Sequence, residues 1–474
     1  MVRWNKYYIF IGLSLLYFIC VFFTRNHIFF WDTVQLGSKH AHWFYENNLK
    51  PGFLPETMDS GHIPFFGYYL AVCWEFFGKT LPVSHFAMLP FGLGIIWQII
   101  RLGTLTLKKE SLLAGTFILL ADPVLTTQML LISPDIWLVF FFLLAVNAIL
   151  KQEKIFLSIG ITGLVLTSQR GMMMAFLLLI TQAVYQYINK KQAFNLKTIP
   201  ALIKPYLPGI IIAIGFLILH YFRKGWIGYH EESPWAGSFD IVSFKEFLRN
   251  QVILAWRLVD FGKILIWIFI FIHLKHIANL LRKKEQKALF IVLFVSLFMV
   301  LYSPVLTIHK NLVGHRYLLP ATILLILLAV KINDKYAFKK RSYIHLFLFV
   351  GLITGNLWRY PETISVGWDA TLAHMPYYGL RKKMISYIEK ENIPIYEIGS
   401  AFPNTTELRY LNLSEDTTSF SKIDMTTNKY ILQSNIFNEI NDSTLLTLHG
   451  SWILQHKLHH GGVYLRLFKN PKYE

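Results

Sequence analysis

The sequence predicts an all-α polytopic membrane protein that carries a small C-terminal α/β or α+β domain. Of its 474 residues, 54% are hydrophobic, and the mean hydropathy is +0.42, which indicates more apolar surface than one soluble core can bury. Apolar runs recur as far as residue 358, and apolar density falls from Pro361 onward. The net charge of +18 comes from Lys and Arg in short clusters between these runs, which is a topology signal rather than a nucleic-acid-binding face. We therefore expect a lipid bilayer as a partner, and no nucleic acid.

About eleven transmembrane spans are predicted, because about 17 to 25 apolar residues cross a bilayer. The first span follows Arg3 and Lys6 and is not followed by a small-residue cleavage site, so we expect an uncleaved helix. The predicted spans are 7–23, 86–106, 111–130, 135–150, 155–168, 171–188, 206–222, 253–273, 288–305, 317–331 and 343–358.

One further apolar stretch, 63–77, decides the topology, because counting it as a span would invert every later loop. If it does not cross, the basic loops all lie with the basic N-terminus in the cytoplasm, as the positive-inside rule requires. The stretch is short, contains Glu75 and is rich in aromatic residues that suit the headgroup boundary. We predict an interfacial helix at 63–77 within a first outer loop, 24–85. The basic loops hold Lys108, Lys109, Lys151, Lys154, Lys190, Lys191, Lys197, Lys204, Arg282, Lys283, Lys284, Lys287, Lys335, Lys339, Lys340 and Arg341.

Two domains follow from this topology: a transmembrane domain, 1–358, and a soluble C-terminal domain, 359–474, on the outer face. In the second, a helical pattern over 378–391 gives way to short strand-like runs. We expect strands at 393–398, 429–432, 452–454 and 463–468, with a turn at 459–462 before the last.

Two acids are predicted to meet at the outer membrane face. Asp32 follows an aromatic cluster just beyond the first span, and Asp135 opens the fourth span after Ser133-Pro134. Taken singly, each acid is typical of a helix cap or helix start, where Asp is favoured. The topology nevertheless brings both to one face, and acids at a membrane boundary are costly enough to suggest a function.

Three cationic residues are expected on the same face. His62 begins the interfacial helix, Arg170 lies in the polar break between two spans, and Arg316 precedes the tenth span. The alternative for each Arg is that it snorkels to lipid headgroups. Arg257 and Asp260 are expected to form an i,i+3 ion pair on the eighth span.

These residue types fit sugar transfer from a lipid phosphate. Because the leaving group is already a stable phosphate anion, no strong general acid is needed. One carboxylate can take the proton of an acceptor hydroxyl while Arg, Lys, His or a metal ion holds the phosphate. Glycoside hydrolysis would instead require two carboxylates flanking the bond.

At these positions the chain resembles the GT-C membrane glycosyltransferases. The similarity is to family 39, which includes protein O-mannosyltransferases and the lipid A aminoarabinose transferase. Asp32 falls at the family's first-loop catalytic acid, and the run from Gly61 to Tyr69 looks like its His-Pro-Pro or Lys-Pro-Pro segment. Asp135 is similar to the second acidic motif, Arg170 stands near a Thr-Lys-Gly type motif, and Arg316-Tyr317-Leu318-Leu319-Pro320 looks like an Arg-Tyr-Leu-Leu-Pro signature. The resemblance covers roughly the first 330 residues, with three departures: Thr33 in place of a second acid, one Pro in the His62 motif, and Arg for Lys at 170.

The resemblance implies a GT-C fold and a hexosyl- or pentosyltransferase that depends on a polyprenyl-phosphate sugar. Asp32 would be the general base or acceptor-orienting acid, and Asp135 would support it. His62, Arg170 and Arg316 would hold the lipid phosphate. The implied partners are the polyprenyl-phosphate donor and a lipid, glycan or protein acceptor. No metal ligands are predicted, and a divalent metal remains an open option as cofactor.

Two other functions stay open. A lipid or glycan transporter would use the same basic loops, although it would be expected to show charged or broken helices near the midplane. A surface-polysaccharide polymerase or ligase would place key residues in a late outer loop, and the loop 223–250 contains Tyr229-His230-Glu231-Glu232. We interpret that motif as a solvated turn. The Lys- and Ile-rich composition favours a bacterial inner membrane.

Overall fold

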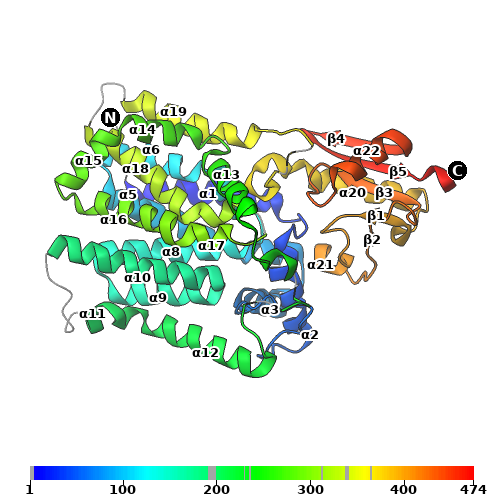
Figure 1. Cartoon of the computed structure of the whole chain (residues 1–474), viewed down its shortest axis with the longest axis horizontal. Helices are drawn as coiled ribbons and strands as arrows, with labels where there is room; N and C mark the ends of the chain where they lie inside the picture. The colour runs from blue at the N-terminus through cyan, green and yellow to red at the C-terminus, as the bar shows by residue number, and fades with distance from the viewer. Residues whose placement is uncertain are drawn as a thin grey trace.

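The computed structural model of the chain describes residues 5–190, 199–228, 230–233, 236–310, 313–336, 341–362, 364 and 366–473. Among the basic loop residues named above, Lys191, Lys197, Lys339 and Lys340 lie outside these ranges, as does Tyr229. Figure 1 shows a bundle of helices along the long axis, with a small sheet domain at one end. The amino end of the chain lies at the other end of the bundle.

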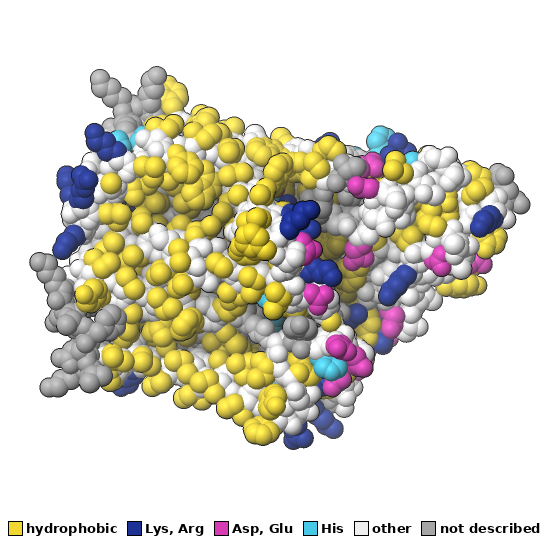
Figure 2. All heavy atoms as spheres, viewed as in Figure 1, with side chains coloured by type: hydrophobic (Ala, Val, Ile, Leu, Met, Phe, Trp, Pro, Cys, Tyr) yellow, Lys and Arg dark blue, Asp and Glu magenta, His cyan; other side chains and the backbone are white. Residues whose placement is uncertain are grey.

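Seven helical segments of the described chain are long and apolar enough to cross a membrane. They are Lys6–Thr24 (α1), Leu81–Thr106 (α4, Leu81–Phe86, and α5, Leu89–Thr106), Pro134–Lys151 (α8), Gln169–Asn189 (within α10, Gln169–Lys190), Ile199–Lys224 (α11, Ile199–Ile203, and α12, Leu207–Lys224), Gln286–Thr307 (α16, Gln286–Leu297, and α17, Ser303–Thr307) and His315–Tyr336 (with α18, Leu319–Tyr336). Apolar side chains cover the bundle surface in Figure 2, and Lys and Arg gather at the end remote from the sheet domain. The protein is therefore an integral, multi-pass membrane protein.

Two further segments are bent pairs that pass the same test together. The first joins Lys109–Leu120, which contains α6 (Leu112–Leu120), to α7 (Pro123–Leu130) with a bend of 68°. The second joins α14 (Ile264–Ile272) to α15 (Leu274–Arg282) with a bend of 62°. Within the described ranges, up to nine segments are thus long and apolar enough to span a membrane.

The remaining predicted spans are short helices. The stretch 155–168 forms α9 (Lys154–Thr167), and 343–358 forms α19 (Arg341–Thr354), each of 14 residues. At about 1.5 Å per residue such a helix is about 21 Å long, which is less than the hydrocarbon core of about 30 Å. A helix lies at every predicted position, and the count of eleven crossings stays a prediction.

The span predicted over 253–273 is wrong as one continuous helix. Instead, α13 (Phe244–Val259) ends at Asp260, and α14 begins at Ile264. Phe261 and Gly262 between them have φ of 52° and 82°, which a continuing helix cannot adopt. A Cβ on Gly262 would lie 1.9 Å from the carbonyl oxygen of Gly351, so glycine allows this break to pack against α19.

The centre of the bundle is α18, where 94% of the span is buried, with α8 beside it at 78%. α1 and α12 are peripheral, with 28% and 17% of their spans buried. Their outer faces are apolar because lipid is their solvent. The central helices are therefore rigid supports for residues at their ends.

The first loop folds into helices over one end of the bundle. A π-helical turn, Val34–Lys39 (η1), leads into α2 (His40–Glu46), and α3 (Phe65–Phe77) packs against both. The helix predicted over 63–77 is thus present as α3. Trp74 of α3 is buried, whereas Phe76 and Phe77 are about three-quarters exposed, as an amphipathic helix at a membrane surface requires.

The C-terminal part contains a five-stranded sheet in the order β2-β1-β3-β5-β4. β1 runs parallel to β2 and β3, and β5 pairs antiparallel with β3 and β4. The strands are β1 (Ile398–Ser400), β2 (Ser421–Lys422), β3 (Tyr430–Ser434), β4 (Ile453–His460) and β5 (Val463–Lys469); the helices are α20 (Pro376–Lys390), α21 (Leu408–Asn412) and α22 (Asp442–Ser451).

One strand prediction and one turn prediction in this part were wrong. The strand expected at 393–398 is a 3-10 turn, Ile395–Glu397, followed by β1. The turn expected at 459–462 is confined to Gly461 and Gly462, which have φ of 58° and 92°. The preceding histidines belong to β4, because two glycines in positive φ suffice for a tight hairpin.

Candidate active site

A cluster of charged side chains lies where the first loop, the bundle and the sheet domain meet. Arg316 forms ion pairs with Asp32, Asp135 and Asp369. Its Nε lies 3.2 Å from Asp135 Oδ2, and its two Nη atoms contact Asp32 and Asp369. A planar guanidinium is the side chain best suited to serve several carboxylates at once.

Asp32 does not cap a helix, although its sequence context allowed that interpretation. The backbone bonds at this turn are made by Thr33, whose Oγ1 accepts from the Phe30 N–H and donates to the Phe30 carbonyl. The Asp32 carboxylate is left free to turn toward Arg316. With 32% of its side chain exposed, it is the most accessible of the three acids.

Asp135 is likewise not the cap of α8. Ser133 fills that position, since its Oγ accepts from the Asp135 N–H at 3.2 Å. The Asp135 carboxylate is only 6% exposed and lies between the two arginines. Arg170 Nη1 donates to Asp135 Oδ1 at 2.8 Å.

The two arginines flank one aromatic ring. The guanidinium carbon of Arg170 lies 4.1 Å from the centroid of the Tyr317 ring, and that of Arg316 lies 5.1 Å away. The negative face of an aromatic ring attracts each cation, which offsets part of the repulsion between the two guanidinium groups. Neither arginine snorkels outward, because both are fixed by ring and carboxylate.

The charges of this cluster do not balance. Three carboxylates face two guanidinium groups, which leaves one net negative charge when all are ionised. Buried ion pairs are expensive to desolvate, and removing one member exposes the others to uncompensated charge. An arrangement of this cost, gathered from five distant segments, is typical of a functional site.

His62 lies beside the cluster, in a small cavity shared with Asp135 and Arg170. Burial and the neighbouring positive charge of Arg170 lower the pKa of His62 to about 3. Such a pKa favours an uncharged ring at neutral pH, and the part of His62 in phosphate binding stays a prediction. A neutral imidazole can still donate one hydrogen bond.

The loop that carries His62 is held by buried polar contacts. Asp59 Oδ2 lies 3.1 Å from His220 Nε2 on α12, and Asp59 Oδ1 accepts from the Gly61 N–H at 2.8 Å. Gln169, next to Arg170, donates to the Gly61 carbonyl at 2.8 Å. The loop around His62 is therefore tied to two helices of the bundle.

Glycine is required at position 61. Gly61 has φ of 71°, and a Cβ there would lie 2.2 Å from the carbonyl oxygen of Gly228. Both the left-handed backbone and the close approach exclude larger residues. This close approach brings the first loop against the loop that follows α12.

A second buried group lies behind Arg316. His315 Nε2 is 2.8 Å from Asp260 Oδ2, and the Tyr360 hydroxyl donates to the other oxygen of the same carboxylate. Arg257 Nη1 lies 3.8 Å from Asp260 Oδ2, so the expected i,i+3 pair is present. Because His315 adjoins Arg316, this group fixes the backbone that presents the guanidinium.

Comparison with known proteins finds similar structures but no match by sequence. No protein-family model matches the chain, and no curated protein matches it either. ArnT from Cupriavidus metallidurans, solved bound to undecaprenyl phosphate, superposes with a TM-score of 0.56 at 11% identity and covers 97% of both chains. The mycobacterial arabinofuranosyltransferase AftD gives a TM-score of 0.50 at 11% identity, over 99% of this chain and 40% of its own. The chain has the GT-C fold.

Within this GT-C fold, the residues predicted from sequence gather at one end of the bundle. Asp32, Asp135, Arg170 and Arg316 all line or join the same charged cluster, and His62 occupies the adjoining cavity. Asp369 was missed. It follows Trp368, as Asp32 follows Trp31, but it lies beyond the last predicted span in a region interpreted as a separate domain. The position of Tyr317 between the two arginines was not predicted, and the predicted Arg257–Asp260 pair was expected without its contacts to His315 and Tyr360.

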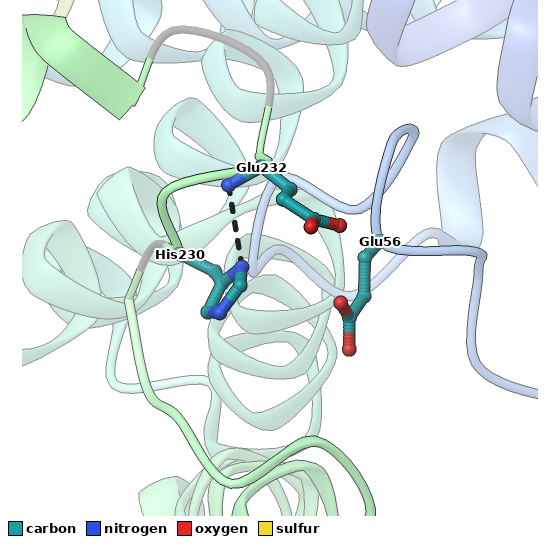
Figure 3. A group of neighbouring side chains, drawn as sticks. All are labelled: Glu56, His230 and Glu232. Carbon is teal, nitrogen blue, oxygen red and sulfur yellow. Dashed lines mark hydrogen bonds between the residues drawn. The ribbon is translucent and has the colours of Figure 1, made fainter.

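A different group, Glu56, His230 and Glu232, offers ligand atoms that lie within 4.8 Å of one another. Figure 3 shows the first-loop residue Glu56 facing the two residues of the loop after α12. Two carboxylates and one imidazole suit a divalent cation. His230 Nδ1 accepts from the Glu232 N–H at 3.2 Å, which leaves Nε2 as the ring nitrogen available for a metal.

Proposed function

We propose that the protein is a glycosyltransferase that moves a sugar from a polyprenyl-phosphate carrier to a hydroxyl acceptor. The observation that carries the proposal is the cluster of Asp32, Asp135, Arg170 and Arg316 at one end of the helix bundle of a GT-C fold. ArnT, with which the chain shares its fold, was solved with undecaprenyl phosphate. The same class of lipid would bring an anionic leaving group to the two arginines.

Asp32 is the proposed general base. It is the most exposed of the three acids, so an acceptor hydroxyl can reach its carboxylate. The hydroxyl proton passes to Asp32 as the oxygen attacks the anomeric carbon, and the bond from that carbon to the phosphate oxygen breaks. Asp135 is a positioning residue, because its carboxylate orients both arginines.

Arg316 and Arg170 are the proposed phosphate-binding residues. Guanidinium groups bind phosphate oxygens through paired hydrogen bonds and stabilise the charge that develops on the leaving group. His62 contributes a hydrogen bond rather than a charge, because its pKa lies far below neutral pH. A donor phosphate can bind Arg316 at its remaining Nη1 N–H or in place of one of the three carboxylates.

We place the reacting end of the bundle outside the cytoplasm. The basic loops lie at the opposite end, in Figure 2 as in the sequence, and positive loops remain in the cytoplasm. The sheet domain is then outside as well, and a bacterial inner membrane fits this orientation. A tag at the C-terminus can be labelled with a reagent that does not cross the membrane. Labelling that occurs only after the membrane is permeabilised would place the tag in the cytoplasm and contradict this orientation.

A deletion strain tests the reaction class. If the protein transfers a sugar from a lipid carrier, its loss makes the polyprenyl-phosphate sugar accumulate, and mass spectrometry of the lipid extract identifies it. Loss of a transporter would instead leave its lipid-linked substrate on the inner leaflet, and no lipid-linked sugar would accumulate on the outer leaflet. Unchanged lipid-linked sugars would contradict the proposal.

We further propose that a divalent cation binds Glu56, His230 and Glu232 and joins the two loops that carry them. Glu56 and Glu232 come from two different loops, and no ion pair of either residue occurs within the described ranges. Adding Zn²⁺ to metal-free protein should then raise the melting temperature, and Glu56→Gln should remove the rise. Equal stabilisation of the variant would overturn this assignment.

A further inference from the structure

A pocket of about 410 Å³ lies between α6 and α19, at the end of the bundle remote from the charged cluster. Its volume is within the range of about 300 to 1,000 Å³ that is usual for small-molecule sites. Its polar lining residues are Glu110, Arg341, Ser342 and His345. None of them takes part in the proposed transfer reaction.

The polar residues of this pocket include groups without partners. His345 is 7% exposed, and its Nε2 makes no hydrogen bond within the described part of the chain. Glu110 is exposed and forms no ion pair with any residue that the structure describes. Arg341 Nη1 lies 3.3 Å from Asp334 Oδ1, so its charge is fixed at the pocket edge.

The apolar residues of the pocket lie farther along the same two helices. Phe117 and Phe349 line its wall, and Leu346 of α19 is 57% exposed. Glu110, Arg341 and Ser342 precede these residues, at the first turn of α19 and just before α6. The cavity is polar at the helix ends and apolar toward the bilayer centre. A phospholipid has the same distribution, with a polar headgroup and apolar acyl chains.

The signs of the charges select among lipid headgroups. A phosphate suits Arg341, the Ser342 hydroxyl and the unpartnered His345 nitrogen, and the start of α19 favours an anion there. Glu110 suits a primary ammonium group and repels a headgroup that is only anionic. A quaternary ammonium has no N–H to donate to a carboxylate, so phosphatidylcholine fits less well.

We propose that this pocket binds one phospholipid with a phosphoethanolamine headgroup, with its phosphate at His345 and Arg341 and its ammonium group at Glu110. The basic loops at this end place the lipid in the cytoplasmic leaflet. The lipid fills the space between α6 and the short helix α19. It thereby stabilises α19, which is too short to span the bilayer without such support.

The test uses the full-length protein in detergent, stripped of lipid. Phosphatidylethanolamine, phosphatidylcholine and phosphatidylglycerol with identical acyl chains are added in turn. Binding is followed by native mass spectrometry and by the melting temperature. We expect phosphatidylethanolamine to bind tightest, and Glu110→Gln to reduce its advantage over phosphatidylcholine by roughly two- to fivefold, the value of one exposed ion pair.

Two variants separate the headgroup contacts from general effects. His345→Leu should weaken all three lipids, because each carries a phosphate. Lys109→Gln changes a neighbouring charge outside the pocket lining and should leave the lipid order unchanged. Equal or tighter binding of phosphatidylglycerol, or an undiminished advantage of phosphatidylethanolamine over phosphatidylcholine in Glu110→Gln, would overturn the proposal.

Discussion

Arg316 is the residue on which the proposed active site depends. Its guanidinium contacts carboxylates from the first loop, the start of α8 and the C-terminal part of the chain. The side chain is 12% exposed, so its charge is balanced by protein groups more than by water. In the donor complex, a phosphate would compete with this carboxylate set for the guanidinium.

Asp369 is the carboxylate most easily replaced, because it belongs to a 3-10 turn rather than to the bundle. Asp369→Asn would make the charges of the cluster equal, with two carboxylates facing two guanidinium groups. We expect this variant to bind the lipid-phosphate donor more tightly, by about fivefold or more, since one competing charge is removed. Donor titration by fluorescence or calorimetry measures the change, and weaker binding would show that Asp369 supports the donor instead.

At the residue scale the sequence indicated most of the cluster, though not its chemistry. Asp32 and Asp135 each had a competing cap interpretation, and only the folded chain shows that Thr33 and Ser133 make those bonds instead. His62 was expected to be a cation, and enclosure beside Arg170 removes its charge. Burial and neighbours set such properties, and neither is visible in a local pattern.

At the scale of elements, the loop that carries His62 depends on one glycine. Gly61→Ala should disturb this loop, because a Cβ would meet the Gly228 carbonyl. We expect a large loss of transfer activity with a lowered melting temperature. Gly78→Ala is the matched control: its φ of 94° is also left-handed, but nothing lies within 4 Å of its Cβ.

The control variant should show only the backbone cost of a left-handed residue, about 1 kcal/mol or somewhat more. Circular dichroism melts and the transfer assay distinguish the two variants. Equal activity in both would mean that the close approach of the two loops has no part in the reaction.

Helix positions were predicted well because apolar runs between basic clusters are a strong signal. The break at Asp260 was missed, since hydrophobicity continues across it. Its signals were one acid and one glycine inside an apolar run. Strand ends in the C-terminal part were also missed, because short strands are fixed by their partners in the sheet rather than by local sequence.

At the scale of the whole molecule, the first loop and the C-terminal part meet through two histidines, His27, which is half-buried, and His374, which is buried. His27 stacks on Tyr378 with ring centroids 3.9 Å apart, and His374 stacks on Phe30 at 4.8 Å. Burial lowers the pKa of His27 and of His374 to about 4. Both rings are therefore neutral in the folded protein until the pH falls to about 4.

This contact makes stability depend on pH. Between about pH 6.5 and 4 the unfolded chain binds protons at these histidines and the folded chain does not, so stability falls as the pH is lowered. We expect the melting temperature to decrease from pH 7 to pH 4.5. His27→Phe keeps the ring and cannot be protonated, and should flatten the decrease; an equal slope would contradict the role of His27.

The overall architecture could be predicted because charge asymmetry and hydrophobicity act over the whole chain. The joining of the C-terminal part to the active site could not. Asp369 reaches Arg316 only because the chain returns across the end of the bundle after α19. Contacts between parts so distant in sequence leave no periodic pattern to read.

The central claim is that Asp32 takes the proton of the acceptor in a sugar transfer from a lipid phosphate. Its most direct test compares wild-type protein, Asp32→Asn and Asp442→Asn, reconstituted in vesicles with polyprenyl-phosphate sugar. Asp442 is an exposed acid on α22, outside the cluster, so its variant controls for the loss of one charge. We expect Asp32→Asn to lose transfer at least a hundredfold while its melting temperature stays near that of the wild type, and Asp442→Asn to keep full activity. Transfer by Asp32→Asn at the wild-type rate would contradict the account.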